Sequence, residues 1–242
     1  MEWTGEGIVL SVRRHGESAA LIEVFTPEQG RHAGLVRGGA GRRLAPVLQP
    51  GAQVHVRWRA RLGEHTGTFT VEPLRARLGL LTGDRLALTG LQTVCALLVQ
   101  VLPERAAYPR VHAATETLLD LMPQTEAWPV AYLRWEMGLL EAMGVGLDLS
   151  RCAVTGARTG LAYVSPRTGR AVTAVGAGEL APKLLALPPC MTGTAPASMA
   201  EIATALRTTG HFFAAHLGRS EGGPVLPGAR ARLIDLLARG TE

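Results

Sequence analysis

The stretch that decides the fold is AQVHVRWRAR, residues 52–61. Apolar and polar side chains alternate along it, and the apolar face carries Ala52, Val54, Val56, Trp58 and Ala60. A period of two over this length is typical of an antiparallel strand with one buried face. The opposite face carries the polar set, which is Gln53, His55, Arg57, Arg59 and Arg61. We therefore expect a half-buried strand that turns a row of arginines outward.

The flanking sequence predicts four more short strands, at residues 7–14, 19–25, 31–36 and 66–72. Glycine-containing turns separate them, such as residues 27–30, where proline comes early and glycine late. Five short strands with such turns in about 75 residues favour a small Greek-key β-barrel of the oligonucleotide/oligosaccharide-binding (OB) type.

Arginine is concentrated in residues 31–61, which hold seven arginines, and no Asp or Glu occurs between Glu28 and Glu64. The loop at residues 37–43, RGGAGRR, lies within this stretch. Its glycines can bring backbone N–H groups close to an anion, and arginine meets phosphate in a bidentate way. In strand 52–61 the arginines would lie about 7 Å apart, near the spacing of phosphates along a nucleic acid. The alternative is a solvated hairpin whose arginines only keep the protein soluble.

The charge distribution favours an anionic partner for the first third of the chain. Residues 1–85 hold twelve arginines and eight acidic residues, whereas residues 86–242 hold thirteen Lys or Arg and twelve acidic residues. A localised basic excess is typical of nucleic-acid binding. Aromatic residues are few, so backbone contact with weak sequence preference is expected. The predicted DNA-binding residues are Arg31, Arg37, Arg42, Arg43, His55, Arg57, Arg59 and Arg61.

After Pro73 the pattern becomes helical. Apolar spacing, the N-cap residue Asp84 and prolines in first turns predict helices at residues 85–102, 109–121, 128–143, 179–187, 199–217 and 229–239. A hairpin is expected at residues 161–164 and 170–173. The fold class is therefore α+β multidomain: an OB-type barrel at residues 1–80, then a mostly α-helical domain at residues 81–242 with a loop and hairpin region at 145–178.

Composition limits the class of protein. With 242 residues, 47% of them hydrophobic, the chain can bury a real core. No apolar run approaches the roughly 20 residues of a membrane span, and the start lacks a basic n-region. Three cysteines cannot form a disulfide framework, which fits a reducing compartment. We expect a cytoplasmic protein.

Signatures of catalysis and of metal binding are scarce. Residues 34–39 have the glycine spacing of a phosphate loop, but Ala40 and Gly41 stand where lysine and Ser/Thr are required. A second cysteine three residues after Cys152 would indicate zinc, yet Thr155 occupies that position, and one thiolate cannot hold a structural zinc ion. We expect no enzymatic activity, no catalytic residues, no metal and no cofactor.

Several short motifs, in order, resemble the RecO family of bacterial DNA repair and recombination mediators. They are GEGIVL at residues 5–10 with GES at 16–18, RGGAGRR at 37–43 with LQP at 48–50, RWE at 134–136 with LLEAMG at 139–144, and LDL at 147–149 before Cys152. The resemblance covers nearly the full chain. The sequence departs from the family at the zinc site, because only Cys152 remains of the usual four cysteines.

The resemblance implies an N-terminal OB domain, a helical C-terminal domain and binding of single- and double-stranded DNA. It also implies annealing of complementary strands, the partner RecR, the acidic C-terminal tail of single-strand-binding protein (SSB), and help in loading recombinase (RecA) onto SSB-coated DNA at the nucleoid. The alternative is a protein-interaction scaffold with a merely structural barrel. Candidates for binding an acidic tail, chosen by charge alone, are Arg207, Arg219, Arg230 and Arg232.

Overall fold

The computed structural model describes residues 1–61, 66–193, 196–217 and 226–240. The chain forms two compact units, Met1–Thr125 and Glu126–Glu242. The two units divide after Thr125, and a compact unit can contain more than one domain. The domain boundary near residue 80 therefore stays a prediction.

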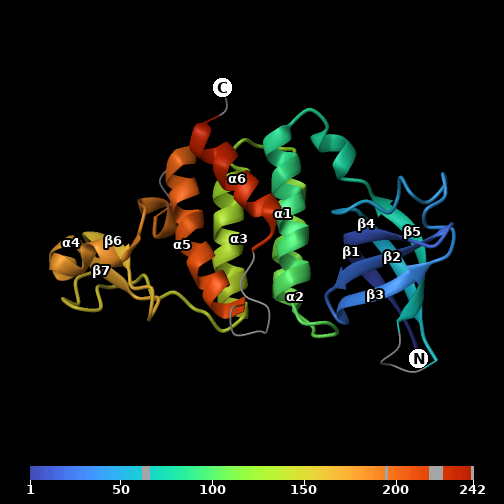
Figure 1. Cartoon of the computed structure of the whole chain (residues 1–242), viewed down its shortest axis with the longest axis horizontal. Coiled ribbons are helices and arrows are strands. Elements are labelled where there is room, and N and C mark those ends of the chain that lie inside the picture. Colours follow the sequence, from blue (N-terminus) through green and yellow to red (C-terminus); the bar gives the residue numbers. More distant parts are fainter. Residues whose placement is uncertain (62–65, 194–195, 218–225, 241–242) are drawn as a thin grey trace. The chain divides into compact units, whose positions relative to one another are not determined.

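Five strands close into a barrel in the first unit (Figure 1). They are β1 (Glu2–His15), β2 (Ala19–Thr26), β3 (Gly30–Val36), β4 (Gln53–Arg59) and β5 (Gly67–Arg75). The order around the barrel is β1-β2-β3-β5-β4, with β4 returning to β1. Every pairing is antiparallel except that of β3 with β5. The predicted OB-type barrel is confirmed.

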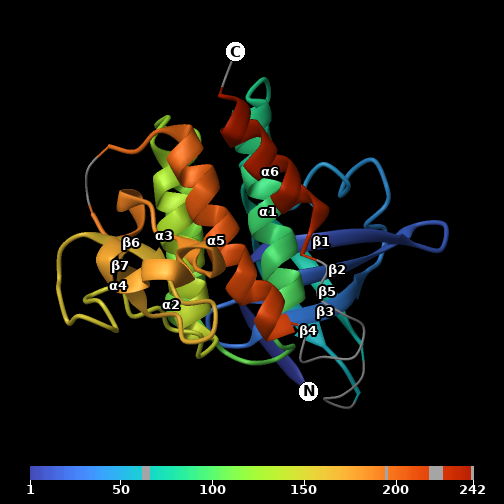
Figure 2. The same ribbon diagram turned by 60° about the vertical axis from the view of Figure 1, so that its left-hand side comes forward.

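Several strand boundaries differ from the expectation, and β5 ends at Arg75, three residues later than expected. β1 begins at Glu2, five residues early, because residues 2–8 pair with β4 despite glycines at positions 5 and 7. Val24 Cγ1 would lie 2.7 Å from a Cβ at Gly7, so glycine is needed at this close crossing. β4 ends at Arg59, so Arg61 lies beyond the strand. In Figure 2 the N-terminus and the β1–β2 turn lie at opposite ends of β1.

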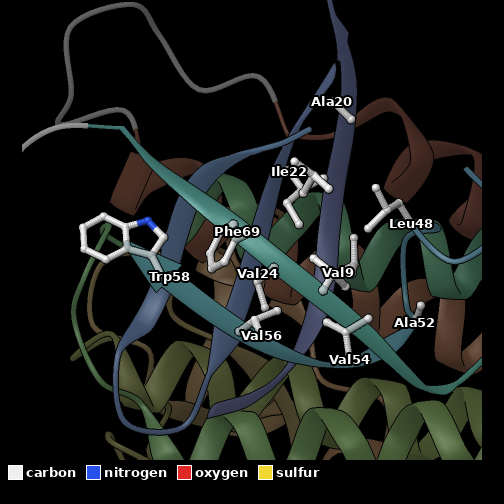
Figure 3. Packing of buried hydrophobic residues seen from close by; sticks show 12 residues of the cluster. Val9, Ala20, Ile22, Val24, Leu48, Ala52, Val54, Val56, Trp58 and Phe69 are labelled. Atoms are coloured by element: carbon white, nitrogen blue, oxygen red, sulfur yellow. The ribbon is translucent and has the colours of Figure 1, made fainter. Parts of the chain in front are cut away.

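The barrel interior holds the apolar face predicted for strand 52–61. Val54 and Val56 are completely buried and Trp58 nearly so, together with side chains from the other strands. Figure 3 shows Val24, Val56 and Phe69 converging inside the barrel, with Trp58 at one end of the cluster and Leu48 at the other. Burial of this alternate set is what turns Arg57 and Arg59 outward.

Two helices pack on the barrel within the first unit. They are α1 (Arg85–Val101) and α2 (Pro109–Leu121), and a short 3₁₀ turn, Leu78–Leu81, precedes α1. Asp84 caps α1 as predicted, since its side chain accepts a hydrogen bond from the Ala87 N–H at 2.9 Å. Arg77 is buried and joins the barrel to α2, because it donates to the Asp120 carboxylate (2.6 Å) and to the Gly51 carbonyl (3.1 Å).

The second unit contains three longer helices, α3 (Trp128–Ala142), α5 (Met199–Leu217) and α6 (Gly228–Arg239). Arg230 of α6 is buried and donates to both carboxylate oxygens of Glu136 on α3, at 2.8 and 2.9 Å. A further hydrogen bond at 3.0 Å reaches the hydroxyl of Thr209 on α5. This cluster ties the three helices together, so Arg230 is not available as a surface site for an acidic tail.

Residues 145–187 form a small module, called here the hairpin module. It contains β6 (Leu161–Val164), β7 (Ala171–Thr173), α4 (Ala174–Ala177), the 3₁₀ helix Gly178–Lys183 and β8 (Leu185–Ala186); the 3₁₀ turn Pro189–Met191 follows it. The predicted hairpin is confirmed. The helix predicted at 179–187 is wrong, because Pro182 lies inside a 3₁₀ helix and residues 185–186 pair with β6. No helix among the described residues is long and apolar enough to cross a membrane.

His112 provides a test of how α2 packs on the barrel. Its ring is buried on α2 with its centroid 5.2 Å from that of Phe25 on β2, and burial lowers its pKa to about 4. Between about pH 6.5 and pH 4 the His112 ring is protonated in the unfolded chain but neutral in the folded chain. Stability should therefore fall as the pH drops from 6.5 toward 4, by about 3 kcal/mol in total.

The measurement is amide hydrogen exchange of β2 and α2 between pH 4.5 and 7.5, compared with His112→Gln. The variant should be less stable near neutral pH but should lose less stability on acidification. Equal acid dependence in the two proteins would contradict the assignment to His112.

Candidate nucleic-acid interface

Arg57 and Arg59 extend from the outer face of β4. Their side chains are 58% and 66% exposed, and Arg61 is exposed just beyond the strand. Register places Thr4 and Thr70 on either side of Arg57, and Thr68 beside Arg59. The three threonines are exposed as well. Guanidinium and hydroxyl groups in neighbouring rows are donors that suit phosphate oxygens.

Glu2 contacts both arginines of this row. Its carboxylate accepts a hydrogen bond from Arg59 Nε at 2.9 Å and lies 3.7 Å from Arg57 Nε. An exposed ion pair of this kind contributes little to stability. A phosphate approaching the row must therefore compete with one carboxylate, and the removal of that carboxylate should strengthen anion binding.

A shallow depression adjoins the row and has a volume of about 690 Å³. Arg59 and Arg61 line it together with the exposed hydroxyls of Thr66 and Thr68, and the remaining lining residues are Met1, Glu2, Ala60 and Gly67. The Met1 amino group donates to the Ala60 carbonyl at 2.7 Å and so holds this edge in place. Sequence periodicity could not reveal the hollow, because its two sides come from opposite ends of the barrel sequence.

His55 occupies a different electrostatic setting from the arginines on the same face. It pairs in register with Glu6 of β1 and Glu72 of β5, and Gln53 beside it donates to Glu116 at 2.9 Å. The outer face of β4 therefore changes from basic to acidic toward α2. The basic part consists of Arg57 and Arg59, with Arg61 past the strand end.

The glycine-arginine loop is folded onto the barrel. The N–H groups of Gly39, Ala40 and Gly41 donate to the carbonyls of Val36, Ser18 and Gly38 at 2.9–3.1 Å. Gly39 is required there, since a Cβ would lie 2.8 Å from that of Ala20. Because these three amides are already used, an anion would meet mainly the exposed side chains of the loop, which are Arg37, Arg42 and Arg43.

Six of the eight predicted residues form two clusters. The loop arginines lie beside Ser18, at the β1–β2 turn, whereas Arg57 and Arg59 pair with the first residues of β1. β1 has 14 residues, so its two ends are up to about 40 Å apart along the strand. Arg13 and Arg14, both exposed, belong with the loop cluster.

Arg31 lies apart from both clusters. Its guanidinium pairs with the buried carboxylate of Glu23 and donates to the Leu102 carbonyl at 3.0 Å, and its side chain is only 14% exposed. Trp58 is also buried in the barrel interior, as predicted, and its indole N–H donates to the Ala33 carbonyl at 3.2 Å. Neither side chain has the exposure that a direct contact with DNA requires.

Comparisons with known proteins agree with this architecture. The family model described as "Recombination protein O N terminal" matches residues 1–77, and that described as "Recombination protein O C terminal" matches residues 82–223. The DNA repair protein RecO of Roseobacter denitrificans is 58% identical over 239 residues, 99% of each chain. That of Cereibacter sphaeroides (strain ATCC 17025) is 59% identical over 240 residues, 99% of this chain and 100% of the relative.

The chain belongs to the RecO family of DNA repair proteins. The resemblance carried by the short motifs is thereby confirmed. In the RecO family model the barrel corresponds to the N-terminal match, and α1 to α5 fall within the C-terminal match.

The zinc site implied by the RecO resemblance does not fit the residues around Cys152. Its buried Sγ accepts hydrogen bonds from the backbone N–H groups of Thr155 and Thr173, each at 3.3 Å, and lies 3.5 Å from the Thr173 hydroxyl. Hydrogen-bond donors thus stand where metal ligands would be needed. Among the described residues no group of three or more His, Cys, Asp or Glu could hold a metal ion. Burial raises the pKa of this thiol, but the hydrogen bonds outweigh it and bring the pKa to about 6.

Cys152→Ala should therefore destabilise the hairpin module, because the buried Thr173 amide and the partly buried Thr155 amide lose their acceptor. The expected cost is about 1–3 kcal/mol, measured by urea unfolding or by hydrogen exchange of β7. A chelator should leave the stability of the unsubstituted protein unchanged. A large loss of stability on chelation would show that a metal, rather than hydrogen bonding to sulfur, holds the module.

Proposed function

We propose that this chain is a non-enzymatic mediator of DNA repair that binds single- and double-stranded DNA through its phosphates. It anneals complementary strands and helps to load recombinase onto SSB-coated DNA. The observation that carries the proposal is the row of Arg57, Arg59 and Arg61 beside exposed threonines. Arg37, Arg42 and Arg43 form a second part of the surface, at the other end of β1. Buried aromatic side chains favour backbone contact over base stacking, and hence weak sequence preference.

The decisive variant changes Arg57, Arg59 and Arg61 together to Ala. Each phosphate contact contributes about 0.7–0.9 to the slope of log K against log salt, so the slope should shrink by about two to three units. DNA affinity measured by fluorescence anisotropy across a salt series gives this slope. The matched control removes three other exposed arginines, in Arg85→Ala/Arg110→Ala/Arg134→Ala, and should keep a slope near that of the unsubstituted protein.

Glu2→Gln supplies an independent arm of the same test, since it removes charge without removing a cation. Affinity at low salt should rise about threefold or more, and the gain should shrink as salt screens the arginines. An unchanged slope in the folded triple variant, together with no gain in Glu2→Gln, would exclude this face from DNA binding.

We also propose RecR and the acidic C-terminal tail of SSB as protein partners, with RecA reached indirectly. The support is membership of the RecO family and a basic chain that an acidic peptide would complement. Among the charge-based candidates Arg207 and Arg232 are exposed, Arg230 is buried, and Arg219 lies outside the described residues.

Capture of SSB on immobilised protein, compared with capture of a tail-deleted SSB, tests this partner. The full-length form should be retained and the tail-deleted form should be lost. Equal retention of the two forms would refute recognition of the tail. Loss of SSB binding with intact DNA binding in Arg207→Ala/Arg232→Ala would favour the scaffold function as a separate activity.

A further inference from the structure

The positive charge of the second unit is concentrated in the hairpin module. Residues 145–187 hold five Lys or Arg and two acidic residues, Asp148 and Glu179. The rest of residues 126–242 holds six Lys or Arg and seven acidic residues. The module is therefore the second place in the chain, after the barrel, where cations gather in excess over anions.

Most of these cations lie at one end of the module, which we call the module tip and define as residues 151–160 and 174–183. Arg151, Arg158 and Lys183 are exposed there and form no ion pair within the described part of the chain. Arg170, in contrast, directly precedes β7, and its Nε lies 3.6 Å from Oδ2 of Asp148. Arg167 is exposed in the β6–β7 turn.

The two segments of the tip pack against each other at Gly176, and hydrogen bonds hold the first segment in place. The Cys152 N–H donates to the Ala157 carbonyl at 2.7 Å, and the Ala153 N–H donates to the Ala171 carbonyl at 2.8 Å. A Cβ on Gly176 would lie 3.3 Å from that of Val154, so α4 packs directly on the loop. Figure 1 shows α4 at the outer end of the module, with β6 and β7 between it and α5.

Two exposed valines lie in the same segments as these cations. Val154 is 67% exposed and Val175 is 89% exposed, which means that both side chains protrude instead of lining a hollow. A protruding apolar side chain flanked by cations suits insertion against unstacked bases, with the cations on phosphates. An acidic peptide would be better served by a receiving groove with an apolar floor.

We infer that the module tip is a second nucleic-acid contact, in which Arg151, Arg158 and Lys183 bind the phosphates of a single strand and Val154 and Val175 contact its bases. The inference rests on the proposed function, because annealing by one chain requires that two strands be held at once. The arginine row of β4 then holds one strand and the module tip holds the other.

Titration of the full chain with a labelled oligonucleotide of about 12 nucleotides, at low salt, tests the inference by stoichiometry. The unsubstituted protein should bind two strands per chain. Arg151→Ala/Arg158→Ala/Lys183→Ala should bind one, and its rate of annealing at saturating protein should fall about tenfold. Val175→Ser, which keeps every charge, should slow annealing by a smaller factor. The matched control, Arg134→Ala/Arg167→Ala/Arg239→Ala, removes three other exposed arginines and should keep both strands and the full annealing rate.

The outcomes separate this inference from the function on which it rests. If the tip variant keeps two strands and anneals like its control, or if the unsubstituted protein binds one strand, the tip is not a DNA site. Retention of both strands with lost binding of an oligoglutamate peptide would overturn the inference in favour of a protein-binding tip. If the unsubstituted protein neither binds nor anneals DNA, the proposed function itself fails.

Discussion

The first unit depends on one buried guanidinium. Arg77 lies just after β5 and bonds to the Gly51 carbonyl before β4, to the Gln53 side chain at the start of β4, and to Asp120 on α2. Partial burial raises the pKa of Asp120, but hydrogen bonds from Arg77 and Arg75 lower it below its usual value. Loss of the Asp120 carboxylate, which is a third exposed, would leave the buried Arg77 charge without its compensating anion. Arg77 therefore holds α2 to the barrel.

The second unit uses the same device in a different place. Arg230 fixes α6 to α3 and α5 through Glu136, as Arg77 fixes α2 to the barrel. Arg31 is a third example, at the connection that follows α1. Arginine thus has two roles in this protein. Some guanidinium groups are buried and paired within the fold, and others are exposed to solvent or a ligand. Net charge counts both kinds alike, which is why burial has to be known before a basic stretch can be interpreted.

Local patterns predicted most of the elements and the outward direction of part of the candidate interface. The alternation in residues 52–61 was sufficient to orient Trp58 and Arg57, because burial of one face determines the direction of the other. Asp84 and Pro109 marked helix starts because their effects act within one turn. The role of Arg31, the Glu136–Arg230 pair and the separation of the arginines into two clusters could not be predicted in this way. Each depends on contacts between residues far apart in the chain, 94 positions in the case of Glu136 and Arg230, and no period or motif encodes such a pairing.

The closure of the barrel is uneven. Among the described residues β3 and β5 are joined by only two residue pairs, Gly34 with Gly67 and Leu35 with Thr68, whereas each other neighbouring pair of strands shares seven. Separation of β3 from β5, here called opening of the parallel seam, breaks fewer backbone pairings than separation of any other neighbouring strands. It leaves a curved five-stranded sheet in which the hydrogen bonds of Arg77 are kept. Thr68 borders both the seam and Arg59. The arginine row of β4 thus lies beside the joint with the fewest residue pairs, so the surface proposed to bind DNA can change shape there while the rest of the unit stays folded.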